Sequence, residues 1–223
     1  MSQHRKPRTH SVLTQRAIRV GLLAAGAAGL ATAVPAQAVT GTAHSAVALD
    51  RTYSRADVLH HKDMKQSMTV RQFGEVHTGT VRNQATALGV GCSVDDHCRS
   101  VAISMQIVMM AGEHVHLNAI NRGDAINQYC DGCQTLASAY QFVVSTPRPF
   151  ALSKETKGRL ADIHRRLDAL TRSTLRATDL KARVDSLAAE VTAVLRDAVA
   201  KAPKGPVRPN VTLHRHLDGW PAH

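Results

Sequence analysis

Part of this chain occurs twice, and the two copies divide four cysteines between them. Residues 83–108 match residues 121–143, and the offset drops from 38 to 35 because the first cysteine pair encloses five residues and the second encloses two. The matching pairs are Asn83 and Asn121, Ala87 and Ala125, Leu88 and Ile126, Cys92 and Cys130, Cys98 and Cys133, Ala102 and Ala137, Gln106 and Gln141, and Val108 and Val143. A duplicated unit constrains how the core is built, but it names no reaction.

Large and small side chains alternate after the second cysteine of each copy. Residues 101–109 put large residues at the odd positions and Ala102, Ser104, Gln106 and Val108 between them. Residues 136–144 repeat this division. A period of two predicts strands, each with a large-residue face and a small-residue face.

The cysteine pairs stand where the chain is expected to turn. Cys130-Asp-Gly-Cys133 contains the Asp-Gly dipeptide that favours a two-residue hairpin turn. We therefore expect two β-hairpins, each tipped by a cysteine pair. A short helix over 121–130 is the competing interpretation, because alternation is weak there.

The pattern changes to a helical one after two prolines. Apolar residues recur at spacings of three and four, which is typical of helices that pack along one seam: Leu160, Ile163, Leu167 and Leu170, then Leu180, Val184, Leu187, Val191, Val194 and Ala198. Ser153 and Thr178 are the expected N-caps. The short connection predicts an antiparallel pair whose seam packs on the large-residue face. The predicted fold class is α+β, a small antiparallel sheet of two Cys-tipped hairpins packed on a C-terminal antiparallel helix pair.

The two ends of the chain differ in composition from its middle. Residues 1–38 have a basic region, an apolar run and an Ala-x-Ala signal, which predicts a secretory signal peptide cleaved between Ala38 and Val39. The apolar run is shorter than the roughly 20 residues that span a bilayer. We then expect a flexible arm at 39–66, one domain at 67–201 (duplicated unit 83–145, helical hairpin 153–201) and a disordered, basic, Pro-rich tail at 202–223.

Charge and motifs narrow the classes of function. Five of the 28 Lys and Arg residues lie in the predicted signal peptide, and acidic residues are interspersed among the arginines of the predicted helices. This indicates a solvated helix face rather than a nucleic-acid footprint. No standard hydrolase, zinc-protease or phosphate-loop motif is present. We expect a secreted protein without membrane association, cofactor or catalysis.

The four cysteines allow three disulfide pairings. Hairpin geometry favours the local pairs Cys92–Cys98 and Cys130–Cys133, whereas pairs between the copies would close longer loops and stabilise by ~1.5–2 kcal/mol more each. Four thiolates at these short spacings are also a candidate zinc site. A third interpretation makes Cys130 and Cys133 a redox-active pair.

Two further residue pairs are candidates for weaker roles. His114 and His116 would point to the same side of a strand, which makes them a weak metal-binding candidate without a third ligand at a defined spacing. Gln106 and Gln141 occupy equivalent positions on the small-residue face. We expect each of them to hydrogen-bond within the sheet.

The doubled pattern of Asn-x3-Ala, Cys-x(2–5)-Cys and Ala-x3-Gln-x-Val resembles a module in secreted actinobacterial proteins of unassigned function. The resemblance covers about 83–200, including the helical pair, and implies export and this architecture without naming an activity. We expect an exported, non-enzymatic structural or interaction protein, stabilised by disulfides. Its expected partner is a cell-envelope component or a second copy bound through the helical hairpin. The alternative is an extracytoplasmic thiol–disulfide or metal-handling protein that uses the four cysteines.

Overall fold

The computed structural model describes residues 45–219, which all lie within one compact unit of the chain. Seven strands and two helices follow in the order β1 (Ser45–Asp57), β2 (Lys62–Glu75), β3 (Thr78–Val90), β4 (Cys98–Ala111), β5 (His116–Gln128), β6 (Cys133–Thr146), α1 (Lys154–Thr171), α2 (Ala177–Ala200) and β7 (Asn210–Asp218). The predicted signal peptide and its cleavage site, Ala38 and Val39, lie outside the described residues.

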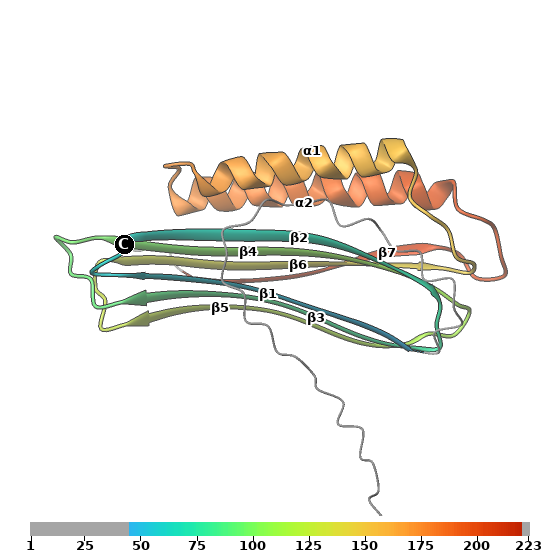
Figure 1. Ribbon diagram of the computed structural model, residues 1–223, viewed down its shortest axis with the longest axis horizontal. Coiled ribbons are helices and arrows are strands. Elements are labelled where there is room, and N and C mark those ends of the chain that lie inside the picture. The colour runs from blue at the N-terminus through green and yellow to red at the C-terminus, as the bar shows by residue number, and fades with distance from the viewer. Residues whose placement is uncertain (1–44, 220–223) are drawn as a thin grey trace, which may run out of the picture. The chain divides into compact units, whose positions relative to one another are not determined.

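The strands form two sheets between which the chain passes back and forth (Figure 1). Sheet A has the order β1-β3-β5, and sheet B has the order β2-β4-β6-β7. All pairs are parallel except β6 with β7. Each passage through both sheets makes one coil, and the three coils are β1–β2, β3–β4 and β5–β6. The strands therefore build a two-sided β-solenoid of three coils.

The expectation of a small antiparallel sheet made of two hairpins is wrong. The strands on either side of each cysteine turn lie in different sheets, and each pairs with its equivalent in the next coil. Asn83 lies opposite Asn121 and Cys98 lies opposite Cys133, so the residues that match between the two copies are register partners. The physical reason is that both strands of a coil carry a small-residue face. Each face is buried against the other sheet, which a flat hairpin cannot achieve.

The described parts of the expected arm and tail also contain strands. Residues 45–66 include β1 and the start of β2, residues 121–128 belong to β5 rather than to a helix, and the tail includes β7. The first coil does not match the two copies in sequence because some of its positions are polar where the next coil has alanine. Ser54 aligns with Ala87, and Lys65 aligns with Ala102. Such polar residues are typical of the terminal repeat of a solenoid, which has a neighbour on one side only.

The two sheets meet through very small side chains. Five alanines with no exposed surface form this contact: Ala85, Ala87, Ala102, Ala137 and Ala139. At Gly123 on β5, an added Cβ would lie 3.0 Å from the carbonyl oxygen of Ala137 on β6. The backbones of the two sheets therefore approach so closely here that only glycine or alanine fits between them.

A chain of polar side chains crosses this interior. Gln141 Nε2 donates to Gln106 Oε1 at 2.8 Å, and Gln106 Nε2 donates to Asp50 Oδ2 at 2.6 Å. Thr69 Oγ1 donates to the same carboxylate oxygen at 2.8 Å. Gln106 and Gln141 thus hydrogen-bond within the structure as expected, and the chain of bonds links all three coils.

A second set of amide bonds runs beside the first. Asn83 Nδ2 donates to Asn121 Oδ1 at 2.9 Å, and Ser104 Oγ donates to Asn83 Oδ1 at 2.6 Å. Buried amides are stabilising only when they are paired. A slip of one residue would turn these side chains to the opposite face, so the pairing specifies the register of the coils.

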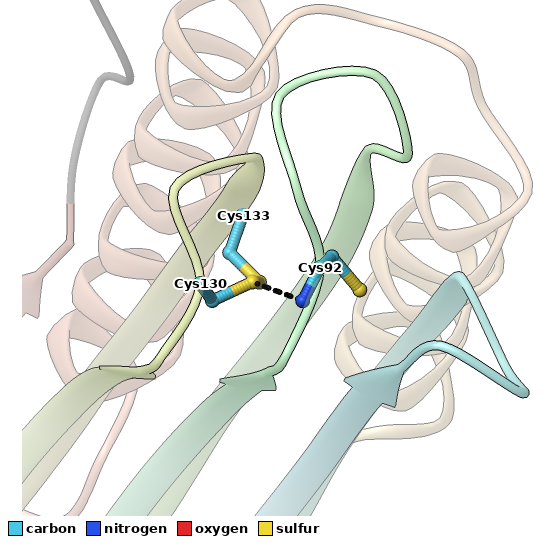
Figure 2. Close-up of side chains that lie close together, drawn as sticks. All are labelled: Cys92, Cys130 and Cys133. Carbon is cyan, nitrogen blue, oxygen red and sulfur yellow. Dashed lines mark hydrogen bonds between the residues drawn. A yellow bond between two sulfur atoms is a disulfide. The ribbon is translucent and has the colours of Figure 1, made fainter.

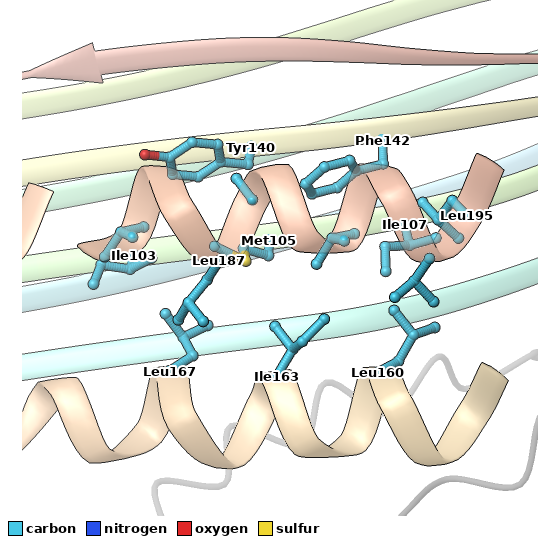
Figure 3. Close-up of a cluster of buried hydrophobic side chains, with 14 of the residues drawn as sticks. Ile103, Met105, Ile107, Tyr140, Phe142, Leu160, Ile163, Leu167, Leu187 and Leu195 are labelled. Carbon is cyan, nitrogen blue, oxygen red and sulfur yellow. The ribbon is translucent and has the colours of Figure 1, made fainter. Parts of the chain in front are cut away.

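The helical hairpin covers the opposite face of sheet B, as its apolar spacing predicts (Figures 1 and 3). Ser153 caps α1 by accepting a hydrogen bond from the amide of Thr156 at 3.1 Å. Thr178 is not the N-cap of α2, since that helix begins one residue earlier, after Arg176. The seam packs on the large side chains of β4 and β6, which include Ile103, Met105, Ile107, Tyr140 and Phe142. The largest hydrophobic cluster therefore lies between sheet B and the helices, and the seam is not left open for a second copy.

Tyr140 forms a polar contact between sheet B and α2. Its hydroxyl donates to Asp185 at 2.7 Å, and Asp185 also accepts from Lys181 at 3.0 Å and from Arg215 on β7 at 2.9 Å. Burial, followed by the hydrogen bond to Asp185, raises the pKa of Tyr140 above its ordinary value. Asp185 thus connects α2 to both β6 and β7.

The close contact between the sheets predicts that added volume is not tolerated there. We expect A137L to destabilise the protein by about 1–3 kcal/mol because the added side chain must push the sheets apart. Urea unfolding followed by circular dichroism measures the change. A189L, at an exposed site on α2, is the matched control and is expected to change stability by no more than about 0.5 kcal/mol. Equal effects of the two substitutions would show that the sheets are not in close contact.

The hydrogen bond of Tyr140 predicts a change in stability at high pH. We expect Y140F to lower the free energy of unfolding at pH 7 by about 1.5–3 kcal/mol, the range for a hydrogen bond to a charged group. The folded protein retains the phenolic proton where the unfolded chain loses it, so this stabilisation is full below about pH 10 and declines above it. Urea unfolding from pH 7 to pH 11 should show the two proteins converging. A difference that stays constant with pH would contradict this assignment.

Candidate functional site

The four cysteines lie together at one end of the solenoid. Cys92 and Cys98 are bonded across the turn from β3 to β4, with their Cα atoms 5.9 Å apart. Cys130 and Cys133 are bonded across the turn from β5 to β6, with their Cα atoms 5.4 Å apart. The structure therefore has the two local pairs.

Parallel stacking brings the second disulfide against the first. The Sγ atoms of Cys92, Cys130 and Cys133 all lie within 4.8 Å of one another. The backbone amide of Cys92 donates to Cys130 Sγ at 3.1 Å, and Figure 2 shows these three side chains with that bond dashed. Three sulfur atoms from two different coils thus occupy one small volume.

Backbone hydrogen bonds hold the two cysteine turns against each other. The amide of Gly132 donates to the carbonyl of Cys92 at 3.2 Å, and the amide of Cys98 donates to the carbonyl of Gly132 at 3.1 Å. Gly132 has no room for a side chain because a Cβ would collide with the carbonyl oxygen of Ser93. The Asp-Gly dipeptide is therefore needed for contact between neighbouring turns.

One of the four cysteines is more exposed to solvent than the others. Cys92, Cys98 and Cys133 are buried, with at most 3% of their surface exposed, while Cys130 is partly exposed. Directly before it, Tyr129 is 97% exposed and has a φ of 51°, a conformation rare outside glycine. The exposed apolar residues Val58, Leu59 and Val94 belong to the other turns at this end of the solenoid.

The histidine pair does not form a metal site with other residues. His114 lies in the turn between β4 and β5 and is exposed, while His116 begins β5 and is also exposed. Within residues 45–219, the one group of His, Cys, Asp or Glu side chains spaced to hold a metal ion is Cys92, Cys130 and Cys133. The two histidines are therefore not brought together with a third ligand.

A second candidate site is the outer face of sheet A. The helices lie beyond sheet B, and no described element covers the outer face of β1, β3 and β5 (Figure 1). Large apolar side chains on this face are 40–60% exposed: Val47, Leu49, Tyr53, Ile120 and Ile126. Parallel sheets are normally covered on both faces, so an open one indicates a surface available for binding.

Arginines stand among these apolar residues. Register places Arg51 on β1 and Arg122 on β5 on either side of Gln84, with Arg82 two residues before Gln84 on β3. Arg122 Nε lies 2.6 Å from Asp124 Oδ1, whereas Arg51 and Arg82 have no carboxylate partner among residues 45–219. The middle of the face therefore carries unneutralised positive charge.

Sequence reasoning missed this face because β1 fell within the expected flexible arm. A signal was present, since Ala46, Ala48 and Ala56 alternate with larger residues in the order later found in β1. Because alanine is only weakly apolar, these inward positions do not stand out as an apolar alternation. Tyr129 was also missed as the exposed aromatic neighbour of Cys130.

In comparisons with known proteins, no family model, no curated protein and no solved structure matches the chain. The two disulfides indicate an oxidising, extracytoplasmic environment. Neither helix among residues 45–219 is long and apolar enough to cross a bilayer.

Proposed function

We propose that this is an exported, non-enzymatic interaction protein that binds an extended anionic polymer of the cell envelope. The binding surface is the outer face of sheet A, and the disulfides stabilise the turns at one end of that sheet. The signal-peptide pattern of residues 1–38 and the two disulfides support export. The observation that carries the proposal is the open, arginine-bearing face of a parallel sheet.

The dimensions of the face favour an extended partner. Strands of 13 residues and a width of three strands give a surface about 40 Å long and about 10 Å wide. Its area is about 400 Å², half of the roughly 800 Å² that each partner contributes to a standard protein–protein interface. A polymer chain that runs along the strands can use the whole of such a stripe.

Charge selects an anionic partner over a second copy. Arg51, Gln84 and Arg122 form the middle row of the outward positions. Face-to-face pairing of two copies about a central two-fold axis would bring these arginines together, and like charges at an interface are unfavourable. Carboxylate or phosphate groups would instead neutralise Arg51 and Arg82, while the flanking apolar residues contact the uncharged parts of the polymer.

Calorimetric titration with two linear polyanions tests the proposal. Polygalacturonate carries carboxylates and polyphosphate carries phosphates, so the tighter ligand identifies the preferred anion. We expect R51E/R82E to weaken binding by at least about tenfold, because each lost charge-assisted contact contributes about 1.5–3 kcal/mol. Binding by the wild-type protein should also weaken as salt is raised.

The matched control is R183E/R196E, which makes the same change of net charge at exposed positions of α2. It should keep most of the wild-type affinity, because α2 lies beyond sheet B, on the side away from sheet A (Figure 1). Equal losses in both double variants would show that net charge alone drives binding. That result, or no binding of either polymer by the wild-type protein, would overturn the proposal.

A further inference from the structure

We propose that the two disulfides form a single thiol–disulfide exchange site, in which Cys130 receives an external thiol and Cys92 links the two coils. This exchange site does not depend on the binding face of sheet A, because it is formed by the sulfur atoms at the end of the solenoid. Its partner is a dithiol of the extracytoplasmic space.

Exposure selects Cys130 as the sulfur that is attacked. It is the partly exposed member of the four, and the other three are buried. The exposed ring of Tyr129 stands directly before it, and Val94 and Leu59 expose apolar surface in the neighbouring turns. An apolar surface beside a reactive disulfide gives a protein dithiol an area on which to dock.

The first step cleaves the Cys130–Cys133 disulfide and leaves a thiolate on the buried Cys133. A thiolate of the external dithiol bonds to Cys130 Sγ, the Cys130–Cys133 bond breaks, and the electron pair leaves on Cys133. The backbone amide of Cys92, which donates to Cys130 Sγ, already lies at this sulfur. The second thiol of the dithiol then attacks the mixed disulfide, which releases Cys130 as a thiolate and the partner as its own disulfide.

The second step passes the electron pair between coils. The Cys133 thiolate attacks Cys92 Sγ, which lies within 4.8 Å of it, and the Cys92–Cys98 bond breaks. The electron pair ends on Cys98, and both Cys98 and Cys130 take protons from water. The two-electron product therefore has a Cys92–Cys133 bond between the coils and thiols at Cys98 and Cys130, and the external dithiol supplies both electrons.

The folded structure already presents the sulfur atoms for this rearrangement. The Sγ atoms of Cys92 and Cys133 lie within 4.8 Å of each other, so the exchange requires no unfolding of either coil. A Cys92–Cys133 bond would join two neighbouring coils, whereas each of the present bonds lies within one turn. The solenoid can thus be reduced by two electrons and still keep one covalent link at this end.

Two variants separate the exchange site from two independent disulfides. C98S leaves Cys92 as a thiol inside the sulfur cluster, and we expect it to take Cys133 as its partner. After acid quenching and alkylation, peptide mass spectrometry should find more label at Cys130 than at Cys92. C92S leaves Cys98, which lies outside the cluster of three, and its label should remain on Cys98. Circular dichroism checks that both variants are folded.

The wild-type protein gives the decisive measurement without a substitution. One equivalent of dithiothreitol, followed by the same mapping, should yield the Cys92–Cys133 bond with label on Cys98 and Cys130. Label confined to Cys130 and Cys133, with Cys92–Cys98 intact, would overturn the proposal. Label on Cys92 alone in C98S would do the same, and equal scrambling in C98S and C92S would overturn the assignment of Cys92.

Discussion

The close contact of two small-residue faces is the constraint on which the rest of this structure depends. Where Gly123 and Ala137 bring the backbones of β5 and β6 together, no large side chain fits between the sheets. The interior of the solenoid therefore holds a smaller apolar cluster than the one under the helices. The large side chains of β4 and β6 are placed on the outer face of sheet B, and the helical hairpin is needed to cover them. Sheet A has no comparable cover among the described residues, and its outer face is left for a partner.

A thin interior also needs a means of fixing register, because alanine contacts alone are similar in neighbouring registers. The amide bonds around Gln106 and Asn83 supply that specificity, since each buried amide is unfavourable unless it meets its partner. Stability and specificity are thus assigned to different places. Apolar burial under the helices stabilises the fold, and the polar chain between the sheets selects one alignment of the coils. The final strand adds a further specific contact, because His216 Nδ1 accepts a hydrogen bond from the amide of Gly123 at 2.8 Å.

The sequence predicted the parts of the fold that depend on local periodicity. The helical pair, its apolar seam and the two faces of residues 101–109 follow from spacing alone, as does the Ser153 cap. Pairing between strands could not be predicted in this way, because alternation says which face is buried and is silent about which strand lies alongside. The spacing of 35 to 38 residues between copies was the available signal for stacked coils, since repeats of 20–50 residues indicate solenoids. The first coil does not show this repeat in its sequence, because Lys65 stands at the position that is equivalent to Ala102. For the same reason Arg51 could not be placed beside Arg122 before the strands were aligned.

Stacking in register converts positions that are distant in sequence into continuous surfaces, and both candidate sites arise in this way. Arginines from three coils become one positive stripe, and cysteines from two turns become one sulfur cluster. The first coil has no cysteine in its turn; there the carboxylate of Asp57 accepts from the amides of Leu59 and His60 at 3.1 and 3.0 Å. All three turns at this end are therefore held, two by covalent bonds and one by hydrogen bonds. A Cys92–Cys133 disulfide would join the β3–β4 coil covalently to the β5–β6 coil. The strands that carry the arginines would keep their spacing, so redox chemistry at the end of the solenoid need not disturb binding along its face.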